Sequence, residues 1–214
     1  HGKIILDACQ RAQIKHVLLM SSELADVAPK EAGHSRSKKE LEVYLQGLEL
    51  DCYSIRRPSS FFENFDDPSV YHPLCRGSLK NLYKGWVQVN YVATADVGKA
   101  TVLTAQNPCE WNGKTLACIT CRDTGEELTK VFSKVSGISC TYTAAPLQFI
   151  LRQLLTDLYH MVVLRRATSA GSWWSEEIRA FRKVLPNAVD FEQLLRTQQT
   201  GWSDRMVPNF AIQH

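Results

Sequence analysis

Glycine and proline are scarce in this chain, which holds 11 glycines and 8 prolines among 214 residues. That scarcity excludes collagen-like and low-complexity chains, and a hydrophobic content of 44% excludes general disorder. An excess of charge of one sign is also absent, since 25 basic and 22 acidic residues leave a net charge of +3. So small a charge, spread along the chain, argues against direct binding of nucleic acid.

Long uninterrupted apolar runs are missing as well. The most apolar window, residues 147–164, contains Arg152, Asp157 and His160, so we expect a packed helix and no membrane contact. The first 20 residues lack the pattern of a secretory signal peptide. The seven cysteines are an odd number, and several stand in apolar stretches, which indicates reduced thiols in the cytoplasm. The chain opens at His1 on a helical pattern, which suggests the rear portion of a longer protein.

Helix and strand patterns alternate at the start of the chain. Residues 3–13 have helical spacing, 17–20 form an apolar run, 35–46 are helical and 48–57 are strand-like. A continuous apolar run such as 17–20 is typical of a strand that is covered on both faces in a parallel sheet. The order predicts an α/β fold with parallel strands.

The rest of the chain is less regular. Residues 66–85 read as a loop. Capping-box spacing at Thr124 and Glu127, and again at Asp190 and Gln193, predicts two helix starts. We expect strands at 86–92, 114–120 and 139–142, and helices at 96–106, 124–135, 147–166, 175–185 and 190–197.

The first candidate site combines Ser21 and Ser22, at the end of the first strand, with His34 and Lys38 on the next helix. Residues four apart share a helix face, so His34 and Lys38 can point into one cleft beside the serines. Ligands of open α/β sheets bind outside the carboxyl ends of the strands, where Ser22 would lie. The alternative is a solvated surface helix, which the spacing alone favours because short motifs are weak signals.

A second candidate is the segment Phe61, Phe62, Glu63 and Asn64, which follows the next strand. Its aromatic rings either stack on a planar cofactor or form a hydrophobic plug over the sheet edge.

Two further motifs have a structural explanation that we favour over a functional one. Cys118 and Cys121 form a C-x-x-C pair. Such a pair is either redox-active or half of a metal site, or, as we favour, consists of two structural cysteines. No metal site is predicted. Basic and aromatic residues gather near 165–183. They form either a surface that contacts a partner protein or, as we favour, a structural group whose tryptophans belong to the core or to a lid.

Several short motifs follow one another along the chain. They are Lys15-His16-Val17 with Ser21-Ser22, His34-x-x-x-Lys38, Arg57-Pro58 with Phe62 to Phe65, Ala95 to Lys99, Asn112-Gly113-Lys114, Thr120 to Thr124, and Pro186-Asn187-Ala188. Together they resemble the NmrA-like family, an atypical branch of the short-chain dehydrogenases, over nearly the whole chain.

The resemblance implies a fold and a cofactor. Residues 1–66 would be the C-terminal half of a Rossmann-type NADP-binding domain, and 67–214 a smaller α+β lobe partly interleaved with it. Ser21, Ser22, Lys38 and the 61–64 segment would contact NADP. His34 stands where active dehydrogenases carry the proton-donating tyrosine, and this difference disfavours enzymatic activity. If the protein is an enzyme, the resemblance implies that His34 and Lys38 are its catalytic pair.

The glycine-rich turn that holds a pyrophosphate is absent from this sequence, in which Gly77 and Gly85 are the closest two glycines. The cofactor site is therefore expected to be incomplete, and the sheet to start at an uncovered apolar edge.

Three functions stay open on this reading. The first is a redox sensor that acts through contacts with a regulatory protein, in the cytoplasm and also in the nucleus. The sequence leaves open whether this sensor forms a homodimer. The second is an NADPH-dependent reductase of quinones or other carbonyls, and the third is a truncated paralogue without cofactor.

Overall fold

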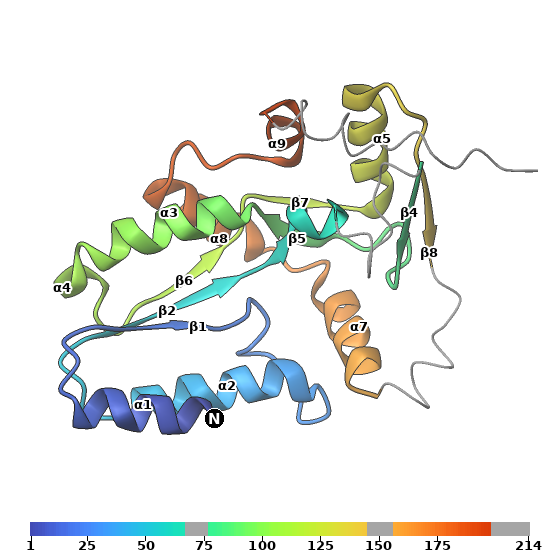
Figure 1. Cartoon of the computed structure of the whole chain (residues 1–214). Coiled ribbons are helices and arrows are strands. Elements are labelled where there is room, and N and C mark those ends of the chain that lie inside the picture. The colour runs from blue at the N-terminus through green and yellow to red at the C-terminus, as the bar shows by residue number, and fades with distance from the viewer. Residues whose placement is uncertain (67–76, 145–155, 198–214) are drawn as a thin grey trace, which may run out of the picture.

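A computed structural model of the chain describes residues 1–66, 77–144 and 156–197 (Figure 1). Its first sheet holds three parallel strands in the order β1-β2-β6, namely β1 (Val17–Met20), β2 (Tyr53–Pro58) and β6 (Thr115–Cys118). The α/β prediction with parallel strands is confirmed. β6 comes from the second of the two predicted regions, so the first sheet draws on both of them.

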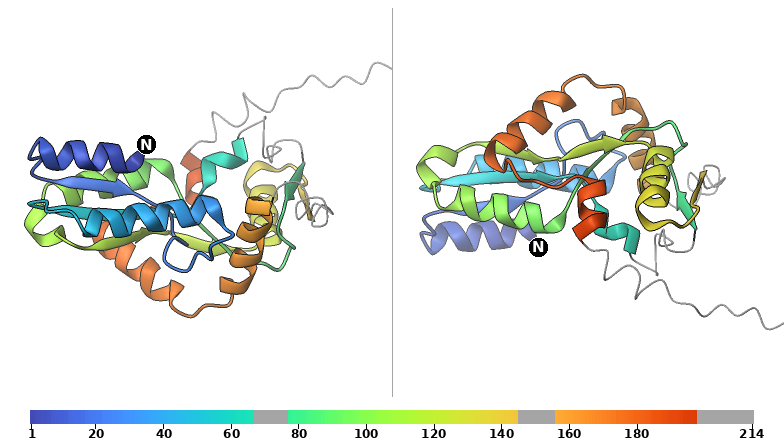
Figure 2. Two further views of the ribbon diagram at one scale, coloured as in Figure 1. Left: turned by 90° about the horizontal axis from the view of Figure 1, so that it is seen from below. Right: turned by 90° about the horizontal axis from the view of Figure 1, so that it is seen from above.

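Helices pack on this sheet through three hydrophobic clusters, and one of them joins α7 (Thr156–Thr168) and α8 (Trp174–Val184) to β6 through Ala117. A second joins α1 (Gly2–Arg11) and α2 (Gly33–Gln46) to β1 and β2, through Leu6, Val17, Leu45 and Ile55. The third joins α3 (Thr94–Ala105) and α8 to β6, where Phe181 is fully buried. Figure 2 shows α1 and α8 on opposite sides of the molecule.

β1 stands at the edge of its sheet, and it is not covered on both faces as its apolar sequence predicted. Val17 is buried, Leu18 and Leu19 are half-buried, and 39% of Met20 is exposed. Beside the strand a groove of about 340 Å³ runs between α1 and β1, lined by Ile5, Cys9, Ile14, Leu18 and other mostly apolar residues. Within the described residues, the expectation of an uncovered apolar edge is therefore confirmed.

A second sheet continues the first. It contains β3 (Ser60–Phe61), β5 (Val89–Val92) and β7 (Cys121–Asp123), with β3 parallel and β7 antiparallel to β5. A separate parallel pair joins β4 (Ser78–Asn81) to β8 (Thr141–Ala144). The short helix α4 (Pro108–Trp111) precedes β6.

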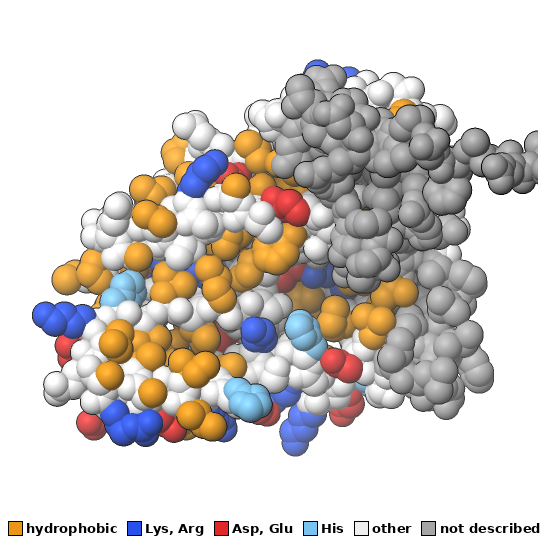
Figure 3. Space-filling view, in the orientation of Figure 1, with side chains coloured by type: hydrophobic (Ala, Val, Ile, Leu, Met, Phe, Trp, Pro, Cys, Tyr) orange, Lys and Arg blue, Asp and Glu red, His pale blue; other side chains and the backbone are white. Residues whose placement is uncertain are grey.

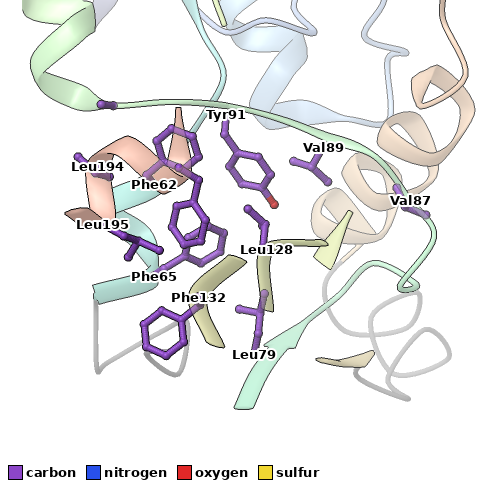
Figure 4. Close-up of a cluster of buried hydrophobic side chains, with 12 residues drawn as sticks. Phe62, Phe65, Leu79, Val87, Val89, Tyr91, Leu128, Phe132, Leu194 and Leu195 are labelled. Carbon is purple, nitrogen blue, oxygen red and sulfur yellow. The ribbon is translucent and has the colours of Figure 1, made fainter. Parts of the chain in front are cut away.

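The largest hydrophobic cluster supports this part of the molecule (Figure 4). It gathers side chains from the 3-10 turn η1 (Phe62–Asp66), from α5 (Gly125–Ser136) and from α9 (Phe191–Thr197) against β5. Helix α7 also lies beside α2. No helix of the described ranges is both long and apolar enough to cross a bilayer.

Several predicted boundaries differ from those of the structure; for example, the strand expected at 86–92 is Val89–Val92. β2 begins at Tyr53 and not at residue 48, because α2 ends at Gln46 with Gly47 as its C-cap and the chain bends irregularly through residues 48–51. The expected loop 66–85 contains β4, whose pairing partner lies some 60 residues further along the chain. The first half of the helix predicted over 147–166 lies outside the described residues.

Candidate functional site

The carboxyl ends of the parallel strands meet at one edge, where polar residues follow each strand. Backbone hydrogen bonds extend the sheet through this edge: Ser21 N–H donates to Arg56 O at 2.7 Å, and Glu23 N–H to Pro58 O at 3.2 Å. Thr120 N–H donates to Tyr91 O at 2.8 Å. These bonds fix the residues after β1 and β6 as firmly as residues within the strands.

A buried polar cluster lies just beyond this edge. Glu23 forms an ion pair with Arg165 of α7, and its Oε2 accepts a hydrogen bond of 2.7 Å from Asn90 Nδ2 on β5. All three residues are buried, with Glu23 5%, Asn90 2% and Arg165 8% exposed. Although burial opposes the charged form, the Glu23 carboxylate holds the pKa of Arg165 above its usual value.

Sequence reasoning missed this cluster. Asn90 and Glu23 are 67 residues apart, and Arg165 lies further along the chain, so no local spacing connects them. The one signal available was an acidic residue directly after the Ser21-Ser22 strand end.

The predicted serines lie at the edge of the sheet. Ser21 is buried, and its hydroxyl oxygen has no hydrogen-bond partner within the described residues. Ser22 is half-buried, and its carbonyl accepts from Ala25 N–H at 3.1 Å. Ser21 is therefore the predicted residue with a free buried polar atom at the carboxyl end of a strand.

The His34 side chain is exposed at the start of α2, and Lys38 is half-buried one turn later. The backbone N–H of His34 donates to both carboxylate oxygens of Asp157 on α7, at 3.0 and 3.1 Å. Asp157 thus docks the N-terminal end of α2 onto α7. The catalytic roles of His34 and Lys38 stay predictions.

The aromatic segment divides between the core and the surface. The Phe62 ring is fully buried and stacks on Tyr91 at 5.6 Å and on Phe191 at 5.3 Å between centroids (Figure 4). The plug alternative therefore describes Phe62, because a ring enclosed by protein cannot stack on a cofactor. Phe61 and Asn64 are half-buried.

Glu63 has a structural partner. Its Oε1 accepts from the backbone N–H of Thr94 at 2.9 Å and from the Thr94 hydroxyl at 2.7 Å, where α3 begins. Its Oε2 is buried without a partner in the described part of the chain. A carboxylate at this end of a helix is favoured by the free N–H groups and the helix dipole.

The C-x-x-C pair is structural. Burial raises the pKa of Cys118 to about 12. Burial and then the charge of Asp123 raise the pKa of Cys121, whose thiol donates to Asp123 Oδ2 at 2.9 Å. Burial therefore disfavours the thiolate, the more nucleophilic form, in both cysteines. Across the described ranges, no group of three or more His, Cys, Asp or Glu side chains could hold a metal ion.

A family model described as the NmrA-like family matches residues 1–185. This chain belongs to the NmrA-like family. Among solved structures, NmrA, a negative transcriptional regulator in complex with NADP, is 17% identical, with 96% of this chain and 72% of that chain covered and a TM-score of 0.69.

Two other similar structures carry enzyme names. A triphenylmethane reductase of Citrobacter sp. complexed with NADP(H) is 13% identical, with 92% of this chain and 69% of that chain covered and a TM-score of 0.71. An NADPH-dependent quinone oxidoreductase from Escherichia coli is 16% identical, covering 92% and 72%, with a TM-score of 0.70. At these identities, the likeness of this NmrA-like chain to them establishes the fold.

The residues present in this NmrA-like chain fit one part of a dinucleotide. Ser21 offers a free buried hydroxyl, and Lys38 and Phe61 are partly open to solvent. They are suited to the ribose and nicotinamide end. In the described ranges the glycines stand singly, so they do not form the glycine-rich turn that commonly holds a pyrophosphate.

Proposed function

We propose that this NmrA-like chain is a regulatory protein linked to NADP(H), which acts through contacts with other proteins and does not turn over a substrate. The observation that carries this proposal is that the acidic side chains at the strand ends, Glu23 and Glu63, are engaged in structural contacts. Glu23 pairs with Arg165, and Glu63 caps α3. A proton donor or acceptor for catalysis must be free to reach a bound substrate.

The family relationship supports a nucleotide as the ligand, since the similar NmrA structure contains NADP. In this proposal the Ser21 hydroxyl and the Lys38 ammonium hold the ribose, and Phe61 borders the nicotinamide ring. When bound, the nicotinamide supplies a hydride-carrying ring whose redox state the protein reports. This chain's own residues bind and orient it.

Exposed apolar surface supports the protein-contact half of the proposal. Hydrophobic side chains gather over α1 and β1 on the face shown in Figure 3. Ile4 and Ile5 are 66% and 63% exposed. Apolar patches on folded proteins commonly mark interaction sites. The cytoplasm, with the nucleus as a second compartment, is the location that fits a regulator without direct nucleic-acid contact.

The test separates binding from turnover. NADPH is titrated onto the full chain by calorimetry, and its oxidation is followed with a panel of quinones. We expect saturable binding and no oxidation above the rate without protein. A Lys38→Ala variant should bind at least about tenfold more weakly, as expected for loss of one charge-assisted contact. Lys130→Ala, an exposed lysine on α5, is the matched control.

A reductase is the second candidate, favoured by the fold that this chain shares with two NADPH-linked reductases. It predicts NADPH oxidation that collapses in both His34→Ala and Lys38→Ala. Quinone-dependent oxidation that survives both changes would contradict His34 and Lys38 as its catalytic pair.

The cofactor-free alternative rests on the missing glycine-rich turn. It predicts a folded chain without saturable NADPH binding at any concentration tested. That result would overturn the nucleotide half of our proposal and leave the protein-contact half to be tested by partner binding alone.

A further inference from the structure

Two cysteines distant in sequence lie side by side at the end of the sheet opposite the candidate site. Cys52 directly precedes β2 and is buried, whereas Cys109 belongs to α4 and is exposed. The Cys52 thiol donates a hydrogen bond of 3.1 Å to the carbonyl oxygen of Pro108. That oxygen and the Cα of Cys109 share one peptide plane, so Cys52 Sγ lies within about 6 Å of the Cys109 Cα by standard peptide dimensions.

Other contacts hold these two segments together. Tyr53 N–H donates to Asn112 Oδ1 at 3.2 Å, and Gly113 N–H donates to Tyr53 O at 2.8 Å. Burial raises the pKa of Cys52, and the nearby Cys109 thiol raises it further. The hydrogen bonds of Tyr53 therefore keep the start of β2 beside the segment that carries Cys109, whatever rotamer each cysteine adopts.

We propose that Cys52 and Cys109 are a redox-active pair that forms a reversible disulfide bond on exposure to peroxide. A disulfide needs the two cysteines to be close neighbours. The Cys52 sulfur, held at the carbonyl oxygen of Pro108, meets this need once the exposed Cys109 side chain turns toward it. The pair is unlike Cys118 and Cys121, neither of which is exposed.

The chemistry takes two steps. The accessible Cys109 sulfur attacks hydrogen peroxide, the O–O bond breaks, and Cys109 becomes a sulfenic acid with release of one water. Cys52 sulfur then attacks the Cys109 sulfur, the S–O bond breaks, and the oxygen leaves as a second water with the Cys52 proton. Peroxide is the oxidant that is reduced, and the two thiols supply both electrons.

The bridge would fix α4 on β2. Trp111 of α4 lies over the buried guanidinium of Arg56 on β2, and the distance from Arg56 Cζ to the ring centroid is 4.8 Å. The same two elements therefore also share a cation–π contact. Because a bridge restricts the unfolded chain, the oxidised protein should unfold at a higher temperature than the reduced protein.

The experiment treats the native full chain with stoichiometric hydrogen peroxide, followed by alkylation and peptide mapping under non-reducing conditions. We expect a peptide linking Cys52 to Cys109, a mass loss of two hydrogens, and reversal by dithiothreitol. Cys109→Ser and Cys52→Ser should each abolish the linked peptide, and Cys140→Ser, on the β4–β8 side of the molecule, should retain it.

Two results would overturn the proposal. One is Cys109 oxidised to sulfinic or sulfonic acid in the wild-type protein while Cys52 stays alkylatable. The other is a disulfide that joins Cys109 to a different cysteine or to a second chain. Both are read from the wild-type map, so an unfolded variant does not weaken the test. None of these outcomes depends on NADPH binding.

Discussion

At the residue scale, the ion pair of Glu23 with Arg165 is the feature with the largest energetic consequence. Both side chains are buried, and Asn90 completes the coordination of the carboxylate. A buried pair gains little over an apolar substitute, but a buried charge left alone is costly. The pair therefore contributes mainly by fixing α7 against the carboxyl end of β1.

This argument predicts that Glu23→Gln destabilises the fold by about 3–5 kcal/mol, because the Arg165 cation stays buried without a counter-charge. The measurement is the free energy of unfolding from urea titration. The double variant Glu23→Gln/Arg165→Met removes both charges and should recover much of the loss. Equal losses in the single and double variants would show that the charge is not the cause.

Asp123 gives a pH-dependent prediction. Burial raises its pKa from 3.8, and the charges of Glu127 and Asp190 raise it further, against the Cys121 hydrogen bond. The folded state therefore binds this proton more tightly than the unfolded state, so the carboxyl group costs stability as the pH rises above 3.8.

Asp123→Asn keeps an oxygen that accepts from Cys121 and cannot ionise. We expect a higher melting temperature than the wild type at pH 7, and a difference that shrinks as the pH falls toward 4. Thermal melts across this range measure it. A constant difference at every pH would assign the effect to packing and not to ionisation.

At the element scale, the start of α5 shows how a local signal fixes a structure. The Thr124 hydroxyl accepts from Glu127 N–H at 3.2 Å, and Glu127 Oε2 accepts from Thr124 N–H at 2.7 Å, which completes the capping box. We expect Thr124→Ala to lower the free energy of unfolding by about 1 kcal/mol. Thr124→Ser keeps the hydroxyl and should lose much less in the same urea titration.

Signals of this kind were sufficient for most helices and for the existence of β1, since periodicity and caps are properties of neighbouring residues. The second predicted box is also present, with Gln193 N–H donating to Asp190 Oδ1 at 2.8 Å. β4 escaped prediction because its partner β8 is distant in sequence. The apolar sequence of β1 alone could not distinguish a strand covered on both faces from one at an edge, which is why the expected cover on both faces was wrong.

The candidate site likewise has features that the sequence predicts and features that depend on the tertiary fold. Ser21 follows a strand directly, so its place at the sheet edge could be predicted from sequence. The burial of Phe62 depends on Tyr91 and Phe191, which reach it from other elements. The Glu23–Arg165 pair joins β1 to α7 through the tertiary fold alone, and no spacing in the sequence indicates it.

At the scale of the whole molecule, the edge of β1 that pairs with no strand of the described ranges bears on behaviour in solution. Val17 N–H donates to Cys52 O and Ser21 N–H to Arg56 O, so these residues turn their polar groups toward β2. Because strand residues alternate, the backbone groups of Leu18 and Met20 point away from β2. An unpaired edge of this kind beside an apolar groove favours pairing with another chain.

We therefore expect the purified chain to self-associate through this edge. Ile5 lines the groove and is 63% exposed, so Ile5→Lys would place a charge where association buries apolar surface. Loss of one buried isoleucine, worth roughly 1.5–3 kcal/mol, should weaken association at least about tenfold in sedimentation experiments over a concentration series. Val102→Lys, at a position 56% exposed on α3, is the matched control. If both variants weakened association equally, general charge repulsion and not the β1 edge would be responsible.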